Sequence, residues 1–456
     1  MARVIEDSIK MLSRIFKAYD IRGIYNEDLT EDIAYKIGRA FVSFLKCKDV
    51  VVGYDMRVSS PKLSNAFMKG VTEQGADAIN IGMVSTDGLY FASGFLKKAG
   101  VMFTASHNPP KYNGIKFCKA NAVPINQDTG LQQIKTIIEK EQYKKINKKG
   151  KIIKKNILEN YVKHVLSFID RNKISNLKIA VDAGNGMAGK IVPLIYKNLQ
   201  VEIVPLYFRL DGTFPNHLAD PSKFENLKKL QEIVKKEKCD FGMAFDGDAD
   251  RIFFIDENGN VANASLISSL IIKNILKKHK NEKIIYNLVC SKIVPETIGK
   301  YGGKAILERV GHSFIKDTMR KTKAIFACEH SAHYYFKRNF NADSGLIASV
   351  IVSEIISKDG RKLSELLKEF EKYFKIEETN FEVEDKESKL KDIERYYKEK
   401  NPKKLMRMDG VSVYFDDFWF NVRPSNTEPL LRVNLEANTQ ELMEEKKKEL
   451  IGVIKA

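Results

Sequence analysis

Three aspartates at alternate positions give the chain its clearest chemical motif. The segment Phe-Asp-Gly-Asp-Ala-Asp-Arg places Asp246, Asp248 and Asp250 directly after an apolar run that predicts a buried strand. Carboxylates so close repel one another unless a cation lies among them, and hard oxygen ligands suit Mg²⁺ or Ca²⁺. A strand precedes the motif and its sixth position is Arg251, which excludes a calcium-binding EF-hand. The simpler alternative is a solvated acidic turn. We expect a metal site completed by a phosphate.

A second motif, Thr-Ala-Ser-His-Asn-Pro-Pro, carries Ser106 and His107 on a loop after a predicted strand at 101–103. Two prolines stiffen this loop, which suits a reactive serine. Neighbouring Ser and His side chains rarely point at each other, and a serine hydrolase would need a remote acid. On these residues alone a structural loop is the commoner interpretation. Lys116 follows in the segment Tyr-Asn-Gly-Ile-Lys.

Two further motifs offer polar ligands. Arg423 opens Arg-Pro-Ser-Asn-Thr-Glu-Pro, whose guanidinium, hydroxyls and amide suit a phosphate, although a simple turn is equally compatible. Glu329, Ser331 and His333 follow a predicted strand at 324–327 and would point the same way if the chain were extended. They suit sugar hydroxyls. A histidine-containing metal site is the alternative, with few ligands.

Short β-branched runs that end in Asp, Asn or Gly must position these loops. They lie at 50–55, 179–186, 241–248 and 284–287, and helices with one apolar face are expected at 224–238 and 266–278. This alternation predicts βαβ units, which gather ligand-binding residues at the carboxyl ends of their strands. After 371–386 the pattern changes to a helix at 387–400, strands at 410–415, 419–423 and 430–435, and a last helix from Thr439, which favours an α+β unit.

The composition narrows the class of protein. The 456 residues carry a net charge of +17, which suits an anionic partner: nucleic acid, an acidic membrane surface or a phosphorylated small molecule. No nucleic-acid motif is present, there is no run of 18 apolar residues, and the N-terminus lacks a signal-peptide core. Five scattered cysteines without CxxC spacing indicate reduced thiols in a cytoplasmic protein. The lysine-rich stretch 143–155 is expected to connect two units and to precede a helix at 157–168.

Six motifs in order resemble the α-D-phosphohexomutase superfamily, the phosphoglucomutase and phosphomannomutase group, over essentially the whole chain. They are FKAYDIRG at 16–23, TASHNPPKYNGIK, FDGDADR, VGHSFIK, CEHSAH and RPSNTEP. The resemblance implies three related α/β domains with mixed sheets and a smaller C-terminal α+β domain around a central cleft. We place the domains at 1–155, 156–259, 260–372 and 373–456.

The resemblance also implies a mechanism. Ser106 would carry a phosphoryl group that passes to the free hydroxyl of a hexose monophosphate, giving a hexose 1,6-bisphosphate whose other phosphate returns to Ser106. Mg²⁺ would be held by Ser106, Asp246, Asp248 and Asp250. Arg22, Arg251 and Lys116 would stabilise the transferred charge. Lys116, His107 and His333 are candidates for moving the hydroxyl proton.

Substrate binding follows from the same resemblance. It implies contacts to the sugar or its phosphate from Tyr19, Gly311, His312, Glu329, Ser331, His333, Arg423, Ser425, Asn426 and Thr427. In the motif at 329–333, which we call the sugar loop, His330 stands at the position that varies within the family. This residue favours mannose and also glucose phosphates, with phosphoglucosamine mutase as the alternative. Cys328 and Ala332 stand where glycine is usual, which leaves the exact hexose open. We expect a phosphorylated hexose as partner, no nucleic acid and no membrane, and a monomer or a homo-oligomer.

Overall fold

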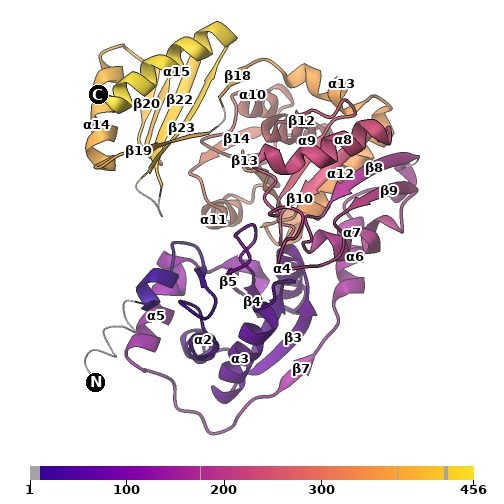
Figure 1. Cartoon of the computed structure of the whole chain (residues 1–456), viewed down its shortest axis with the longest axis vertical. Coiled ribbons are helices and arrows are strands. Elements are labelled where there is room, and N and C mark those ends of the chain that lie inside the picture. The colour runs from indigo at the N-terminus through magenta and orange to yellow at the C-terminus, as the bar shows by residue number, and fades with distance from the viewer. Residues whose placement is uncertain (1–10, 175, 377, 426–429) are drawn as a thin grey trace.

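The computed structural model describes residues 11–174, 176–376, 378–425 and 430–456. Within them the chain forms four β-sheets, each with its own helices (Figure 1). In this view the chain starts in the lower, indigo unit, continues through the magenta and orange units, and ends in the yellow unit at the upper left.

The first sheet has the strand order β1-β5-β4-β2-β3-β7, with β6 beside β5. Its strands are β1 (Ile21–Ile24), β2 (Asp49–Tyr54), β3 (Asp77–Met83), β4 (Ala99–Phe103), β5 (Tyr112–Lys119), β6 (Val123–Pro124) and β7 (Ile152–Lys154). Its helices are α2 (Glu31–Leu45), α3 (Ser60–Glu73), α4 (Thr86–Leu96) and α5 (Gln132–Glu139), with single turns η1 (Ala120–Ala122) and η2 (Gln127–Leu131).

The second sheet has the order β12-β11-β10-β8-β9. It consists of β8 (Leu177–Asp182), β9 (Val201–Leu206), β10 (Phe241–Phe245), β11 (Ile252–Ile255) and β12 (Val261–Ala262). Its helices are α6 (Leu158–Leu166), η3 (Arg171–Lys173), α7 (Ala188–Tyr196), η4 (Phe224–Leu227) and α8 (Lys228–Lys236).

The third sheet has the order β14-β13-β15-β16-β17. It consists of β13 (Lys283–Asn287), β14 (Lys304–Glu308), β15 (Phe326–Cys328), β16 (Tyr334–Phe336) and β17 (Ala342–Asp343). Its helices are α9 (Ala264–Lys278), α10 (Ile293–Lys300), α11 (His312–Thr322), η5 (Lys337–Asn339), α12 (Gly345–Asp359), α13 (Leu363–Leu367) and η6 (Lys368–Phe370).

The fourth sheet is antiparallel, in the order β18-β23-β22-β21-β20 with β19 beside β23. Its strands are β18 (Phe374–Lys375), β19 (Thr379–Glu382), β20 (Lys404–Met406), β21 (Val411–Tyr414), β22 (Phe418–Pro424) and β23 (Leu430–Ala437). Helices α14 (Lys386–Lys398) and α15 (Gln440–Lys455) pack against it. The predicted class is confirmed: three mixed α/β units and a smaller α+β unit.

The first three sheets share one topology. In each, three neighbouring strands run parallel and two antiparallel strands follow at one edge: β3-β2-β4 then β5-β1, β9-β8-β10 then β11-β12, and β14-β13-β15 then β16-β17. In each sheet the chain turns back at the end of the last parallel strand, after β4, β10 and β15. These three reversals carry the serine, aspartate and Glu329–His333 motifs.

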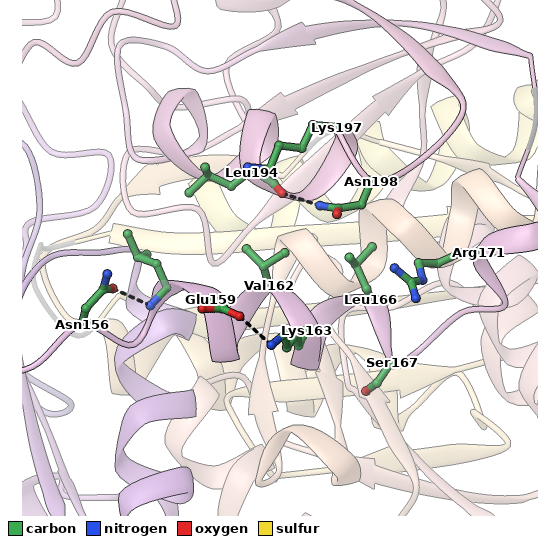
Figure 2. Close-up of a pocket in the computed structure, with 11 residues that line it drawn as sticks. Asn156, Glu159, Val162, Lys163, Leu166, Ser167, Arg171, Leu194, Lys197 and Asn198 are labelled. Atoms are coloured by element: carbon green, nitrogen blue, oxygen red, sulfur yellow. Dashed lines mark hydrogen bonds and ion pairs between the residues drawn. The ribbon is translucent and has the colours of Figure 1, made fainter.

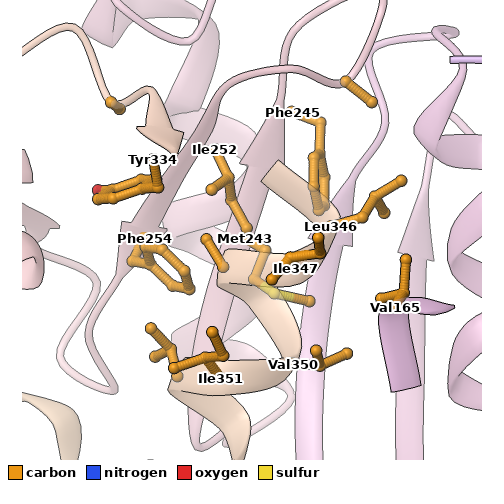
Figure 3. Packing of buried hydrophobic residues seen from close by; sticks show 14 of the residues in the cluster. Val165, Met243, Phe245, Ile252, Phe254, Tyr334, Leu346, Ile347, Val350 and Ile351 are labelled. Carbon is orange, nitrogen blue, oxygen red and sulfur yellow. The ribbon is translucent and has the colours of Figure 1, made fainter. Parts of the chain in front are cut away.

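A continuous hydrophobic core connects the first three units. Figure 3 shows part of it, where the second and third units pack together. Helix α12 lays Leu346 and Ile347 against Met243 and Phe245 of β10. The same cluster extends into the face of the first sheet that carries α4. The fourth unit has a core of its own, built from buried residues between Ile376 and Ile454.

Several helix and strand boundaries differ between the sequence-based prediction and the structure. The helix expected at 224–238 is a single turn followed by α8, which ends at Lys236. The strand expected at 324–327 begins only at Phe326. The lysine-rich connector adds β7 to the edge of the first sheet, where Ile152 is 50% exposed. Among the described residues, no helix is both long and apolar enough to cross a membrane.

Candidate active site

The serine loop is the reversal between β4 and β5, residues 104–111. Ser106 is only 5% exposed and has a left-handed backbone, with φ of 48°. Its Oγ donates a hydrogen bond of 2.6 Å to Asp246 Oδ2 and lies 3.1 Å from His107 Nδ1. The adjacent serine and histidine therefore do meet, and the nearest acid comes from a different sheet.

The metal loop is the reversal between β10 and β11, residues 246–251. One oxygen from each of Asp246, Asp248 and Asp250 lies within 4.8 Å of the others, and all three residues are buried. The Oδ1 atoms of Asp248 and Asp250 are buried without a hydrogen-bond partner. Burial, followed by the charges of Asp250 and Asp248, raises the pKa of Asp246 well above its usual range. Three hard ligands with two unpartnered oxygens fit a Mg²⁺ ion, which would relieve this repulsion.

Lys116 on β5 partly balances the metal loop. Its Nζ lies 2.8 Å from Asp248 Oδ2 and 2.7 Å from Asp250 Oδ2. Burial alone would lower the pKa of Lys116, but the two carboxylates raise it well above its usual range. The lysine is therefore charged and offsets part of the negative charge of the metal loop.

Thr86, a residue outside every predicted motif, also orients the metal loop. It is the first residue of α4, its hydroxyl donates to Asp248 Oδ2, and its N–H donates to the Asp248 carbonyl at 3.0 Å. The only signal in the sequence is its place after the Ser85 cap, which does not identify a partner 162 residues away.

Two arginines bring positive charge to the serine loop. Arg251 Nε lies 3.1 Å from Asp246 Oδ2, and its guanidinium also donates to His107 Nδ1. Arg22 on β1 donates to the Ala105 carbonyl at 2.9 Å. Burial and then the charges of Arg251 and Arg22 hold the pKa of His107 well below its usual range, so this imidazole is neutral.

The sugar loop, residues 329–333, is the reversal between β15 and β16. It is not extended: the Glu329 N–H donates to the His333 carbonyl at 3.0 Å, and Ala332 takes φ of 65°. We predicted that an extended chain would point Glu329, Ser331 and His333 to the same side. The chain is not extended here, so that explanation is wrong. The turn brings them together instead, with Ser331 Oγ 2.9 Å from His333 Nδ1, and His333 Nδ1 3.5 Å from Glu329 Oε2.

Glu329 is held from several sides. Its Oε1 accepts from Asn287 Nδ2 at 3.1 Å and from the Gly311 N–H at 3.3 Å, and its Oε2 accepts from the Tyr335 hydroxyl. His333 Nε2 lies 3.5 Å from Asp250 Oδ1, which connects the sugar loop to the metal loop.

The alternative histidine metal site would use Asp250, His333 and Asp343, which do cluster. However, Asp343 already pairs with buried Lys316 at 2.7 Å. A lysine thus supplies the positive charge there.

A cavity of about 770 Å³ opens beside the serine loop, between the first, third and fourth units. It is lined by Tyr19, Arg22, Asn108, Arg309, Val310 and Asp409, among others. Tyr19 lines the cavity, and its ring lies 5.7 Å from the ring of His312. Gly311 has φ of 136°, and a Cβ there would lie 3.0 Å from the Tyr19 hydroxyl, so this close approach requires glycine.

The fourth unit contributes Arg423, at the end of β22. Its guanidinium pairs with Glu378, while its Nε is buried without a hydrogen-bond partner. Ser425 is buried, and its N–H donates to the Leu430 carbonyl at 2.8 Å. Asn426 and Thr427 lie outside the described residues.

A larger cavity, of about 820 Å³, lies elsewhere, between α6 and α7 (Figure 2). Its floor is apolar, with Val162 and Leu194, and its rim carries an exposed ion pair of 2.6 Å between Glu159 and Lys163. None of the predicted site residues lines this cavity. Volume alone therefore does not locate the chemistry, which gathers at the three strand reversals.

Comparison with known proteins agrees with this geometry. Models of four phosphoglucomutase/phosphomannomutase domains match the chain: α/β/α domain I at residues 13–145, domain II at 159–259, domain III at 263–373 and the C-terminal domain at 378–453. A phosphomannomutase of Methanocaldococcus jannaschii is 43% identical, covering 96% of this chain and 97% of its own. One of Vibrio cholerae is 37% identical, covering 96% and 98%.

Solved structures give the same result. The crystal structure of a phosphoglucomutase/phosphomannomutase family protein from Burkholderia thailandensis superposes with a TM-score of 0.90 at 30% identity, covering 97% of each chain.

Proposed function

The chain belongs to the phosphoglucomutase/phosphomannomutase family and is a phosphohexomutase, and from this premise we propose that its phosphoryl carrier is Ser106. One observation supports the assignment above others. The buried Ser106 Oγ lies 2.6 Å from a carboxylate of the metal loop, where the reversals of the first two sheets meet.

In this proposal the bond between phosphorus and Ser106 Oγ breaks as phosphorus bonds to a free hydroxyl of a hexose monophosphate. The hydroxyl loses its proton and the serine oxygen regains one. The hexose 1,6-bisphosphate then presents its other phosphate, which returns to Ser106 and leaves the isomeric monophosphate. Arg22, Arg251 and Lys116 face the charge that is transferred.

A metal ion fits the same site. Asp246, Asp248, Asp250 and an oxygen of phosphorylated Ser106 would hold Mg²⁺, which neutralises charge on the phosphoryl group when it is bound.

Three side chains are candidates for moving the hydroxyl proton, and they are held differently. His107 is neutral, with its Nδ1 shared between Ser106 and Arg251. Lys116 is charged and paired with two aspartates. His333 lies between Glu329 and Asp250. Separate variants of the three, compared by their pH–rate profiles, would identify the group that titrates.

We propose hexose 6-phosphates and hexose 1-phosphates of mannose, and also of glucose, as substrates. His330 in the sugar loop and the two phosphomannomutase relatives support this choice. Glu329, Ser331, His333, Tyr19, Gly311 and His312 would hold the sugar, and Arg423, Ser425, Asn426 and Thr427 the phosphate that does not react. Phosphoglucosamine mutase is the alternative.

A coupled assay tests the proposal directly. Mannose, glucose and glucosamine 6-phosphates are compared under one set of conditions, and intact mass measures phosphorylation of Ser106. We expect turnover of mannose and glucose phosphates and a phosphorylated Ser106. A clear preference for the amino sugar would overturn the substrate, and full activity in Ser106→Ala would overturn the mechanism.

A further inference from the structure

Arg57 lies directly behind the serine loop and is 1% exposed. Its guanidinium donates four hydrogen bonds, all to main-chain carbonyls. Nη2 donates to Ser106 at 2.8 Å and Asn108 at 2.6 Å, and Nη1 donates to Pro109 and Tyr112, both at 2.9 Å. The main chain of the loop is thus held by one planar guanidinium, whose two forked Nη groups are called the fork below.

The guanidinium is itself fixed by two units. Asp55, which is fully buried, lies 3.4 Å from Arg57 Nε and also accepts from the Arg57 N–H at 3.0 Å and from Ser60 Oγ at 2.6 Å. The Phe214 ring from the second unit lies 5.1 Å from the guanidinium carbon. A carboxylate and an aromatic ring therefore set the plane of the fork.

The serine loop needs such support because its backbone is strained. A non-glycine residue in the left-handed region costs roughly 1–2 kcal/mol and persists only where its surroundings determine it. Ser106 has φ of 48°, and Arg57 binds the carbonyl of that residue and three carbonyls that follow it. Removing the guanidinium would take away the hydrogen bonds to the Ser106 and Asn108 carbonyls and free the loop to relax, whereas the Pro109 carbonyl would keep the Tyr112 N–H.

We infer that Arg57 is a positioning residue for phosphoryl transfer: it holds Ser106 Oγ towards Asp246 without touching the substrate. The inference rests on the proposed role of Ser106. Because the residues proposed to bind the sugar and its phosphate lie on other loops, loss of Arg57 lowers kcat and leaves KM nearly unchanged.

The experiment compares Arg57→Lys and Arg57→Met with a matched control, Arg320→Met. Arg320 is also an arginine that donates to main-chain carbonyls, those of Ala122 at 2.8 Å and Phe340 at 2.7 Å, but it lies outside the residues proposed for catalysis or binding. Steady-state kinetics, thermal unfolding, intact mass and the ³¹P NMR signal of the phosphoserine are measured for each protein.

For both Arg57 variants we expect kcat to fall about 100-fold per folded, phosphorylated enzyme, with an altered ³¹P shift. Lysine does not rescue because it cannot form the fork. Arg320→Met should lose stability but keep kcat, KM and the ³¹P shift. Should the Arg57 variants fail to fold, Asp55→Asn keeps the side-chain shape, removes the charge that orients the guanidinium and replaces one acceptor by an NH₂ donor, and kcat should still fall about tenfold.

Two negative results have different meanings. If wild-type protein turns over without ever carrying a phosphoryl group on Ser106, the proposed function fails. If wild-type Ser106 is phosphorylated but folded Arg57→Lys, or folded Asp55→Asn, retains wild-type kcat, the role of Arg57 is refuted.

Discussion

The serine loop and the sugar loop occupy equivalent reversals of the first and third sheets, and both contain a non-glycine residue in the left-handed region, Ser106 and Ala332. Both close partly through their own main chain, in the serine loop through the Asn108 N–H to the Ala105 carbonyl and the Tyr112 N–H to the Pro109 carbonyl, but their outside support differs. The sugar loop closes on itself, through the Glu329 N–H to the His333 carbonyl and the Ala332 N–H to the Glu329 carbonyl. The serine loop is held from outside by Arg57.

The difference follows from loop length. The sugar loop has five residues between its strands and closes in one turn, with the Ala332 carbonyl accepting from the Ile252 N–H at 3.3 Å. The serine loop, residues 104–111, is longer, and its own turns leave the Ser106 and Asn108 carbonyls to Arg57. A side chain must then bind them, because buried carbonyls are costly when unpaired. Equivalent reversals of two sheets can therefore hold a longer loop through a buried arginine in one sheet and a shorter turn closed mainly by its own main chain in another.

The strongest test of the comparison replaces the serine of each loop. Ser106→Ala should lower turnover by more than about 1,000-fold, because the proposed phosphoryl carrier is gone. Ser331→Ala should keep kcat and raise KM by about tenfold, since an exposed hydroxyl contributes one hydrogen bond. The coupled assay with mannose 1-phosphate measures kcat and KM for both variants. Equal losses of kcat in the two variants would contradict the different roles given to the two loops.

Removal of divalent metal should affect turnover but not the binding of hexose phosphate. EDTA should lower kcat at least about 100-fold, with recovery on adding Mg²⁺, because charge neutralisation at the transferred phosphoryl group is worth several kcal/mol. The sugar loop uses no metal in this scheme, so calorimetric titration should still detect binding of the hexose phosphate. Full turnover in EDTA would contradict the assignment of Asp246, Asp248 and Asp250.

Thr86 offers a subtler change to the metal loop. Thr86→Val removes the hydroxyl that donates to Asp248 and keeps the side-chain shape. Loss of such an outer partner commonly costs 10–100-fold in metal affinity, so the Mg²⁺ concentration at half-maximal rate should rise by about that factor. Restored kcat at saturating Mg²⁺ is the expected control, and an unchanged half-saturation would refute the role.

Lys375 on β18 is another buried cation, and unlike Arg57 it is expected to lose its proton at mildly alkaline pH. Burial lowers the pKa of Lys375 to about 8, and its Nζ donates to the Val289 carbonyl. An unfolded lysine keeps its proton to about pH 10.4, so between pH 8 and 10 the unfolded state binds more protons and stability rises with pH. Relative to Lys375→Met, the wild type should gain about 1–3 kcal/mol across this range. Denaturant unfolding of both proteins measures it, and parallel pH curves would exclude the titration.

The smallest effect concerns the strained alanine. Ala332→Gly relieves the left-handed strain but increases the freedom of the unfolded chain, so the free energy of unfolding should change by less than about 1 kcal/mol. KM should stay within about threefold because the loop's main-chain hydrogen bonds remain. Thermal unfolding and steady-state kinetics check this, and a large loss of affinity would mean that the alanine methyl itself shapes the sugar site.

The sequence identified the motifs because each lies in one short segment. Strand ends at 241–245 and 101–103 placed the aspartates and Ser106 after buried strands, and the burial of the three carboxylates excludes the alternative of a solvated turn. Thr86 and Arg57 were not found. Their partners are main-chain or side-chain atoms many residues away, and no local pattern predicts which strand ends come together.

The continuous core of Figure 3 has a mechanical consequence. Ser106, the aspartates and Glu329 lie on units that share one hydrophobic core. The packing of that core therefore sets the distances between them. Arg423 is borne by the fourth unit, which has a separate interior. A rotation of the fourth unit would therefore move Arg423, which we propose binds the unreactive phosphate, without disturbing the packing that positions Ser106, the aspartates and Glu329.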